Sequence, residues 1–343
     1  MKIVKLDELL IQKYQEYVSN HKNGLFYYSV DFKKFLESLF DIESHYLIAI
    51  DNQEKIIGIF PLMIKNGRFG KVINSLPFYG SNGGILSSSK EASEALYSRY
   101  SKMINDPQFV AGTCIENPLN PESIDYKYNY LDERVGQWTL LKEQTSNSLM
   151  ESFDSSTRRN IRKAEKKGIT IEIDNTAISF LKDIHQQNMN DIGGLAKSDK
   201  FFSLIPNFFK PEQDFDIYVA KKGNKIIAAL LLFYFNHTVE YYTPVIINEH
   251  RSDQPLAGII FQAMSDAINK NYHWWNWGGT WKTQEGVYKF KKKWAAIDKP
   301  YKYYTTINNQ TILDQSKKTL LSEYPNFFVV SFNELKEIDH AKN

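Results

Sequence analysis

Two short basic segments hold the residues best suited to chemistry in this chain. Ser155–Gly168 contains six basic residues and one acidic residue, and Lys282–Lys302 contains seven basic residues and two acidic residues. Each segment therefore has a net charge of +5, whereas the whole chain of 343 residues has a net charge of only +2. Such local concentration favours an anion-binding site over a general nucleic-acid coat, with a solvated helix surface as the alternative.

The first basic segment predicts a helix. Asp154 or Ser155 can cap its N-terminus, and Gly168 can adopt the left-handed conformation that ends it. Arg158 and Arg162 are four residues apart on one flank, so their guanidinium groups suit a diphosphate held by charge-assisted hydrogen bonds. A second face carries the other basic residues of the helix: Arg159, Lys163 and Lys166.

Tryptophan is concentrated in the same half of the chain. Five of the six tryptophans lie between Trp274 and Trp294, interleaved with Gly278, Gly279 and Gly286. Flat indole rings beside glycines, which let a ligand approach the backbone, suit contact with a sugar, a base or an acyl chain. Packing in the protein core is the structural alternative.

These motifs resemble those of a known family. The segment Thr157–Gly168 begins Thr-Arg-Arg-Asn-Ile-Arg-Lys-Ala and resembles a signature of the FemABX-like peptidyl or aminoacyl transferases. Glu285–Trp294 is similar to the family's late Gly-x-Tyr-x-Phe-Lys segment, and Pro77–Gly84 more loosely resembles its Tyr-x-Gly-Gly loop. The resemblance covers most of the chain, and it implies two GCN5-related units and transfer of an acyl group to an amino group.

The resemblance also implies roles for particular residues. Lys291 is expected to supply positive charge to an acceptor phosphate or to the oxyanion of the reaction, and Phe290 to pack beside it. Arg159 and Arg162 are expected to hold the acceptor diphosphate, with Arg158 as the substitute if the helix is rotated. Further substrate contacts are expected from Tyr79, Gly83, Trp281 and Lys282.

The general base is less clearly indicated. Glu240 and Tyr241 lie on the strand expected to line the gap between two separating strands, and Asp253 lies before the next helix. A charge on a strand surface, a core tyrosine and a helix cap are the respective structural alternatives. Water or the substrate itself can also accept the proton.

The elements that must position these residues occur twice. Lys55–Ile59 matches Lys225–Ala229 at a spacing of 170 residues, and each match lies in an expected hairpin followed by a strand, a helix and another strand. We therefore predict an α+β fold of two tandem GCN5-related (GNAT-like) units, residues 1–148 and 149–343, each a mostly antiparallel splayed sheet flanked by helices.

The acyl donor is the main open choice. Enzymes of this fold that use coenzyme A carry a Gln/Arg-x-x-Gly-x-Gly/Ala turn whose amides bind pyrophosphate. In this chain the turn is Arg251–Gly258, and Gln254 takes the place of the first glycine. This departure favours an aminoacyl-tRNA donor over acyl-CoA or acyl carrier protein, with no tightly bound cofactor. The expected acceptor is a nucleotide- or lipid-linked cell-wall or surface-polysaccharide precursor, and peripheral membrane contact is compatible with it.

Several classes of protein are excluded. The seven histidines show no His-x-x-x-His pair and there is one cysteine, so no metal site is expected. There is no serine-hydrolase elbow and no P-loop. The longest apolar run, Ile226–Phe235, is too short to span a membrane, and no export signal is evident, so a cytoplasmic protein is expected. A CoA-dependent N-acetyltransferase of a nucleotide-sugar amine and a non-catalytic nucleic-acid or glycan binding module are the alternatives.

Overall fold

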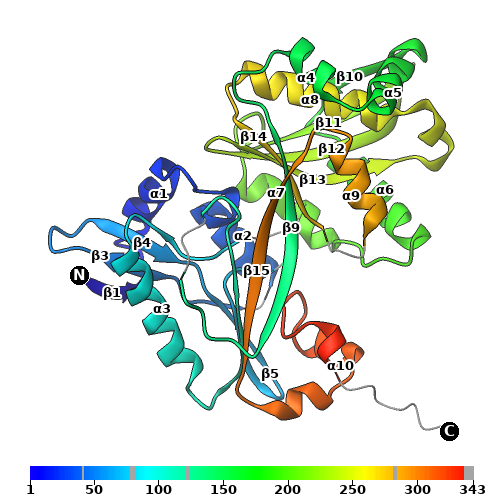
Figure 1. The fold of residues 1–343 in the computed structure, drawn as a ribbon. Helices are drawn as coiled ribbons and strands as arrows, with labels where there is room; N and C mark the ends of the chain where they lie inside the picture. Colours follow the sequence, from blue (N-terminus) through cyan, green and yellow to red (C-terminus); the bar gives the residue numbers. More distant parts are fainter. Residues whose placement is uncertain (41, 78–81, 121–123, 281–283, 336–343) are drawn as a thin grey trace, which may run out of the picture. The chain divides into compact units, whose positions relative to one another are not determined.

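The chain forms two compact units. The computed structural model describes residues 1–40, 42–77, 82–120, 124–280 and 284–335. Unit 1 comprises Met1–Arg134 and Pro300–Asn343, and unit 2 comprises Val135–Lys299. The N-terminal elements, drawn blue in Figure 1, and α10 (Lys317–Glu323), drawn red, therefore belong to the same unit.

These bounds differ from the expected division into 1–148 and 149–343. The chain leaves unit 1 within strand β9 (Tyr130–Leu140) and returns to it within strand β15 (Ile297–Ile307). In unit 1, Tyr303–Ile307 of β15 pair antiparallel with β8 (Phe109–Ile115), and this pairing holds the C-terminal segment there. No local sequence signal distinguishes a strand that closes its own unit from one that completes an earlier unit.

Unit 1 contains two sheet segments, with strand orders β1-β3-β4-β7 and β15-β8-β6-β5-β2. The expected hairpin is present, because β3 and β4 pair antiparallel. The second strand of this hairpin, β4, ends at Phe60, since Pro61 has no backbone N–H to continue a ladder. The α-helices and strands of unit 1 that precede β8 are β1 (Lys2–Lys5), α1 (Ile11–Asn20), α2 (Val30–Leu39), β2 (Glu43–Ser44), β3 (Leu47–Ile50), β4 (Ile56–Phe60), β5 (Met63–Gly67), β6 (Gly70–Asn74), β7 (Leu86–Ser87) and α3 (Lys90–Ile104).

Unit 2 is built on one sheet with the strand order β10-β11-β12-β13-β14-β9. The matching hairpin of β11 and β12 is also present. The elements of unit 2 are α4 (Ser146–Ser152), α5 (Ser155–Lys166), β10 (Ile169–Ile173), α6 (Ile178–Asp191), α7 (Asp199–Phe208), β11 (Phe215–Lys222), β12 (Lys225–Phe235), β13 (Thr238–Ile246), α8 (Pro255–Asn269), β14 (Trp274–Thr280) and α9 (Glu285–Lys292).

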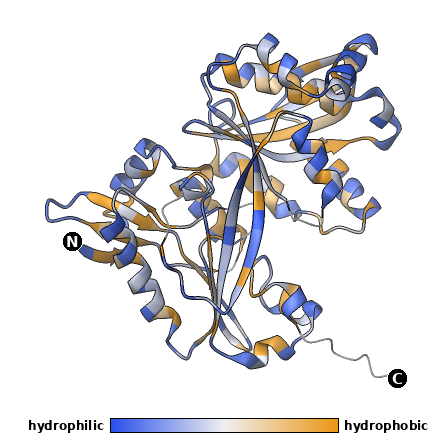
Figure 2. Ribbon diagram, viewed as in Figure 1, coloured by the Kyte–Doolittle hydropathy of each residue, from blue (hydrophilic) through white to orange (hydrophobic). Residues whose placement is uncertain are grey.

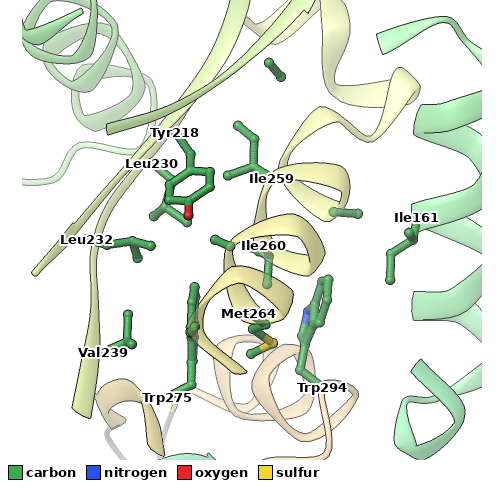
Figure 3. Close-up of a cluster of buried hydrophobic side chains, with 14 of the residues drawn as sticks. Ile161, Tyr218, Leu230, Leu232, Val239, Ile259, Ile260, Met264, Trp275 and Trp294 are labelled. Carbon is green, nitrogen blue, oxygen red and sulfur yellow. The ribbon is translucent and has the colours of Figure 1, made fainter. Parts of the chain in front are cut away.

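Helix α8 forms the centre of the unit 2 core. In Figure 3 it lies between strands that carry Tyr218 and Leu230 and the helix that carries Ile161. Trp275, Trp277 and Trp294 are almost fully buried in the same cluster. These three tryptophans therefore pack the core. For most of the tryptophan cluster, the structure supports core packing over direct ligand contact.

The basic helix α5 packs on α8 through small residues. The Asp154 carboxylate caps α5 by accepting a hydrogen bond from the Ser156 N–H (2.8 Å), and Gly168 follows the helix with φ +67°. A Cβ at Gly258 of α8 would lie 3.3 Å from the Cβ of Ala164, so glycine permits close approach of the two helices. Hydrophilic residues predominate along the rest of α5 (Figure 2).

None of the helices in the described parts of the chain combines the length and the apolar composition that crossing a bilayer requires.

Candidate active site

Strands β13 and β14 separate in the middle of the unit 2 sheet. They pair in parallel only from Thr238–Trp274 to Glu240–Asn276. Beyond Glu240, β13 continues along β12 as far as Ile246, whereas β14 continues along β9 as far as Thr280. The gap between the two strands is called the splay below, and Glu240 and Asn276 mark its closed end.

The chain covers part of its own strand edge at the splay. The Ile247 N–H donates to Ile227 of β12 (2.9 Å), so by strand alternation the backbone groups of Ile246 and Pro244 face the splay. The Asn188 side chain accepts from the Ile246 N–H (3.0 Å) and donates to the Ile246 carbonyl oxygen (2.9 Å). Pro244 has no N–H, so neither position offers a backbone donor to a ligand.

Glu240 is held firmly at the closed end of the splay. Its side chain is buried, and its Oε2 accepts a hydrogen bond from the Asn276 Nδ2 (2.7 Å). The Asn276 Oδ1 in turn accepts from the Gly278 N–H (2.8 Å). Gly278 has φ +75°, a conformation that favours glycine, and the pairing of β14 with β9 is irregular here. This turn links the buried Glu240 carboxylate, through Asn276, to the backbone at Gly278.

Lys291 is a buried lysine on α9, and its side chain is 6 % exposed. Its Nζ donates to the Thr280 Oγ1 (2.8 Å) and to the carbonyl oxygens of Gly278 (3.3 Å) and Gly279 (3.2 Å). The Thr280 hydroxyl donates onward to the Gln137 Oε1 (2.9 Å). Burial lowers the pKa of Lys291 to about 8, because leaving water disfavours the charged form.

A cavity of about 370 Å³ lies in the same unit, and Lys291 and Thr280 are not among its lining residues. It is lined by α5, by α8 with the turn before it, by α9 with the two residues that follow it, and by Ile246 of β13. Its polar and charged lining residues are Ser156, Thr157, Asn160, Arg251, Gln254, Lys289 and Lys293. Its apolar lining includes Leu256, Ile260 and Phe290, and the Phe290 ring is 42 % exposed. The cavity suits a ligand that joins an anionic group to a flat or apolar group.

The turn before α8 departs from the coenzyme A-binding arrangement at Pro255 as well as at Gln254. Gln254 adopts the left-handed conformation (φ +64°), which favours glycine. Pro255 begins α8 and has no N–H, which removes one donor from the first turn of the helix.

The three predicted arginines do not line the cavity. Arg158 donates to the carbonyl oxygens of Glu151 (3.1 Å) and Phe153 and so stabilises the end of α4. Arg159 and Arg162 are exposed. The residues of α5 that face the cavity are instead Ser156, Thr157 and Asn160.

The other predicted residues have different surroundings. Tyr241 is partly buried with its ring 4.9 Å from that of Trp277, and burial raises the pKa of its hydroxyl. Gly83 lies in unit 1, where a Cβ would come within 2.6 Å of the Ser75 carbonyl oxygen. Asp253 accepts from Lys222 (2.9 Å), and that hydrogen bond lowers its pKa. Tyr79, Trp281 and Lys282 are outside the described residues.

Several site residues were missed from the sequence. Lys289 and Lys293 had a signal, since they are four residues apart in the second basic segment. Thr280 and Gln137 had none, because they meet only through the pairing of β14 with β9. Asn188 likewise reaches β13 from a distant helix. Over the described residues, no group of three or more histidine, cysteine, aspartate or glutamate side chains is arranged to hold a metal ion.

The fold is that of tandem GCN5-related proteins, as comparison with solved structures shows. A tandem GNAT protein from the clavulanic acid biosynthesis pathway aligns with a TM-score of 0.51 at 8 % identity, covering 89 % of this chain and 98 % of that one. The C-terminal domain attributed to a lysylphosphatidylglycerol synthetase from Agrobacterium fabrum aligns with a TM-score of 0.54 at 10 % identity, covering 93 % and 98 %. The predicted α+β fold class is confirmed.

Within that class, residues 212–298 match the model of the FemAB family. The crystal structure of FemX aligns with a TM-score of 0.69 at 15 % identity, covering 91 % of this chain and 98 % of that chain. The resemblance to the FemABX-like transferases is thereby confirmed. The matched segment contains Glu240, Asn276 and Lys291, whereas α5 lies outside it. No curated protein sequence matches the chain significantly.

Proposed function

We propose that this chain transfers an aminoacyl group to an amino group of a nucleotide- or lipid-linked precursor of the cell wall or of a surface polysaccharide. The observation that carries the proposal is Lys291, a buried ammonium group bonded to Thr280 beside the splay. In the reaction, the acceptor amine attacks the ester carbonyl carbon of the donor. A C–N bond forms, the C–O bond to the carrier breaks, and the amine loses a proton.

Lys291 fits two steps of this chemistry. Its positive charge can stabilise the oxyanion that develops on the carbonyl oxygen, and its N–H can give a proton to the departing oxygen. A pKa near 8 suits the second role, because such an ammonium loses its proton far more readily than an ordinary lysine. Glu240 is the candidate to receive the amine proton, either directly or through water.

The strand edge favours an ester donor over a pantetheine thioester. An extended pantetheine arm needs backbone partners at an open strand edge. In this chain the Asn188 side chain already binds the backbone N–H and carbonyl oxygen of Ile246, and Pro244 has no N–H. Neither residue can therefore donate a backbone hydrogen bond to the arm. Pro255 also removes an amide from the turn that would bind the pyrophosphate of coenzyme A. Aminoacyl-tRNA is therefore the preferred donor, and acyl-CoA or acyl carrier protein is the alternative.

The acceptor diphosphate is assigned to the exposed arginines Arg159 and Arg162. Neither forms an ion pair with any described residue, so both guanidinium groups remain available for phosphate oxygens. Arg158 is not available as their substitute, since it already donates to the carbonyl oxygens of Glu151 and Phe153 at the end of α4. By its name, the lysylphosphatidylglycerol synthetase relative forms an aminoacylated lipid, which is compatible with an aminoacyl donor and a lipid-linked acceptor.

The test is a transfer assay followed by mass spectrometry of the acceptor. Aminoacyl-tRNA and acetyl-CoA are offered separately with UDP-linked muropeptides or amino sugars. A mass increase of one amino acid with the tRNA donor, lost in Lys291→Met and kept in Lys292→Ala, is the expected result. Acetylation with acetyl-CoA instead would establish the alternative enzyme, and binding without transfer from either donor would establish a binding module.

A further inference from the structure

The three hydrogen bonds of the Lys291 side chain all end on oxygen atoms, which are called the oxygen cage below. The Nζ lies 2.8 Å from the Thr280 Oγ1, and 3.3 Å and 3.2 Å from the carbonyl oxygens of Gly278 and Gly279. An ammonium group has three N–H donors and no acceptor, so it can bind all three oxygens at once. A neutral amine has only two N–H bonds, and its lone pair would face one of these oxygens. The oxygen cage therefore favours the charged form of Lys291, whereas burial disfavours it.

The Thr280 hydroxyl accepts a hydrogen bond from Lys291 because its own proton points elsewhere. A hydroxyl carries one proton, and Thr280 donates this proton to the Oε1 of Gln137 (2.9 Å). Gln137 lies on β9 and is fully buried, and the orientation of its amide is fixed at the other end. There its Nε2 donates to the Tyr288 carbonyl oxygen of α9 (3.2 Å), which can only accept. Gln137 therefore keeps the Thr280 proton away from Lys291.

Nearby charged side chains do not hold the Lys291 ammonium group. Three carboxylates lie in this part of unit 2, and each is bonded to another side chain: Glu240 to Asn276, Glu285 to Lys289 and Asp298 to Lys292. Over the described residues, Lys291 forms no ion pair, and its side-chain hydrogen bonds are those of the oxygen cage. The oxygen cage is therefore the contact that opposes the effect of burial on this lysine.

We propose that Gln137 is a positioning residue that fixes the direction of the hydrogen bonds around Lys291 and thereby keeps this side chain in its ammonium form. The inference rests on the proposed function, in which the charge of Lys291 stabilises the oxyanion. Gln137 touches no reacting atom in that scheme and acts only through Thr280. The short bond to Thr280 holds the ammonium group in place, while the two longer bonds to carbonyl oxygens can be exchanged for the carbonyl oxygen of the donor.

The test is a pH titration of Lys291, followed by NMR on the full chain with carbon-13 in its lysines. The Cε signal of Lys291 is assigned by its absence from Lys291→Arg. Gln137→Met removes both polar atoms of the amide, so the Thr280 proton is free to turn toward the neutral amine. The titration midpoint is expected to fall from about 8 by about one pH unit, a ten-fold change in the acid dissociation constant. The falling limb of kcat/KM should move by the same amount.

Gln137→Glu is the matched variant. Like Gln137→Met it loses the N–H that binds the Tyr288 carbonyl oxygen, but it keeps an acceptor for the Thr280 proton and adds a negative charge. The Lys291 midpoint should therefore rise above that of the parent. A purely structural role predicts the same direction of change in both variants, because both lose the bond to α9. Shifts of the same sign, or no shift, would overturn the proposal. A midpoint that does not rise in Gln137→Glu is decisive by itself, even where Gln137→Met does not fold.

A second comparison checks the route through Thr280. Thr280→Val keeps the shape of the threonine side chain but removes its hydroxyl group. In this background Gln137→Met should cause no further shift of the Lys291 midpoint, since the contact through which Gln137 acts is absent. A further fall of similar size would show a different route and would overturn the proposal.

The NMR midpoint requires no substrate, so the two proposals can fail separately. Opposite shifts in the two Gln137 variants of a protein that transfers nothing from any donor would support the positioning role and overturn the proposed function. Acyl transfer by a protein in which the midpoint is unchanged in both variants would overturn the positioning role alone.

Discussion

Lys291 and Glu240 are linked through the same glycine. The Glu240 carboxylate accepts from the Asn276 amide, the Asn276 oxygen accepts from the Gly278 N–H, and the Gly278 carbonyl oxygen accepts from Lys291. A change at either end therefore alters the hydrogen bonds that hold the Gly278 turn. Because the turn lies at the closed end of the splay, the two predicted catalytic residues belong to one site.

Replacing Lys291 is expected to abolish transfer with little effect on the fold. Lys291→Met keeps the length of the side chain but removes the charge, and the loss of one electrostatic stabiliser lowers kcat by about 10²–10³. The measurement is steady-state kinetics together with thermal unfolding. Lys292→Ala is the matched control, since Lys292 is a neighbouring lysine that is paired with Asp298 at the surface. An equal loss in both variants would contradict a specific role.

The pH dependence of transfer should report the ionisation of Lys291. Deprotonation of the acceptor amine raises the rate with pH, while loss of the Lys291 proton lowers it, so kcat/KM should be bell-shaped with a falling limb near pH 8. In Lys291→Arg the side chain stays charged, and any residual activity should keep rising past that pH. A falling limb that is unchanged in the arginine variant would assign it to another group.

The same burial predicts a stability gain on removal of the lysine charge. The unfolded chain holds the Lys291 proton up to a pH near 10.5, whereas the folded chain releases it near pH 8. Below pH 8 the folded state therefore bears the full free-energy cost of burying the charged ammonium group, about 3 kcal/mol. The free energy of unfolding rises between these two pH values. Urea denaturation should find Lys291→Met more stable than the parent at pH 7, with the difference shrinking by pH 10. A constant difference would show that packing alone explains the change.

Asn188 should contribute to stability through the strand edge that it covers. Asn188→Ala removes both hydrogen bonds to Ile246 and is expected to lower the free energy of unfolding by about 1–3 kcal/mol. Urea titration measures the change, and Gln186→Ala on the exposed side of the same helix is the control. If Asn188→Ala were neutral, water would replace the side chain at no cost, and the closed-edge argument against pantetheine would fail.

Substitution of Gly83 distinguishes a structural role of this residue from a role in substrate binding. In the structure a Cβ at this position meets the Ser75 carbonyl oxygen at 2.6 Å, so Gly83→Ala must displace backbone. We expect a lower melting temperature, equivalent to about 1–3 kcal/mol, with KM for the acceptor unchanged. A raised KM in a variant of parental stability would support the substrate contact expected from the family resemblance.

Local sequence signals predicted the elements better than the contacts between them. The cap at Asp154, the end of α5 at Gly168 and both hairpins are confirmed, because each depends on residues close in sequence. The rotation of α5 was not predictable. The packing of Ala164 against Gly258 helps to decide that Ser156 and Asn160 face the cavity, and sequence periodicity alone does not specify this. Partners such as Gln137 depend on strand pairing over long sequence separations.

The passage of the chain through β9 and β15 has a consequence for synthesis. Unit 2 is a continuous stretch, Val135–Lys299, whereas unit 1 needs Pro300–Asn343 for completion. A ribosome therefore releases every residue of unit 2 before the strand that covers β8 of unit 1. The second unit can fold first, while the nascent first unit exposes an unpaired strand edge. Premature termination anywhere before Pro300 would leave that edge open, so truncated chains should be targets for chaperones and proteases.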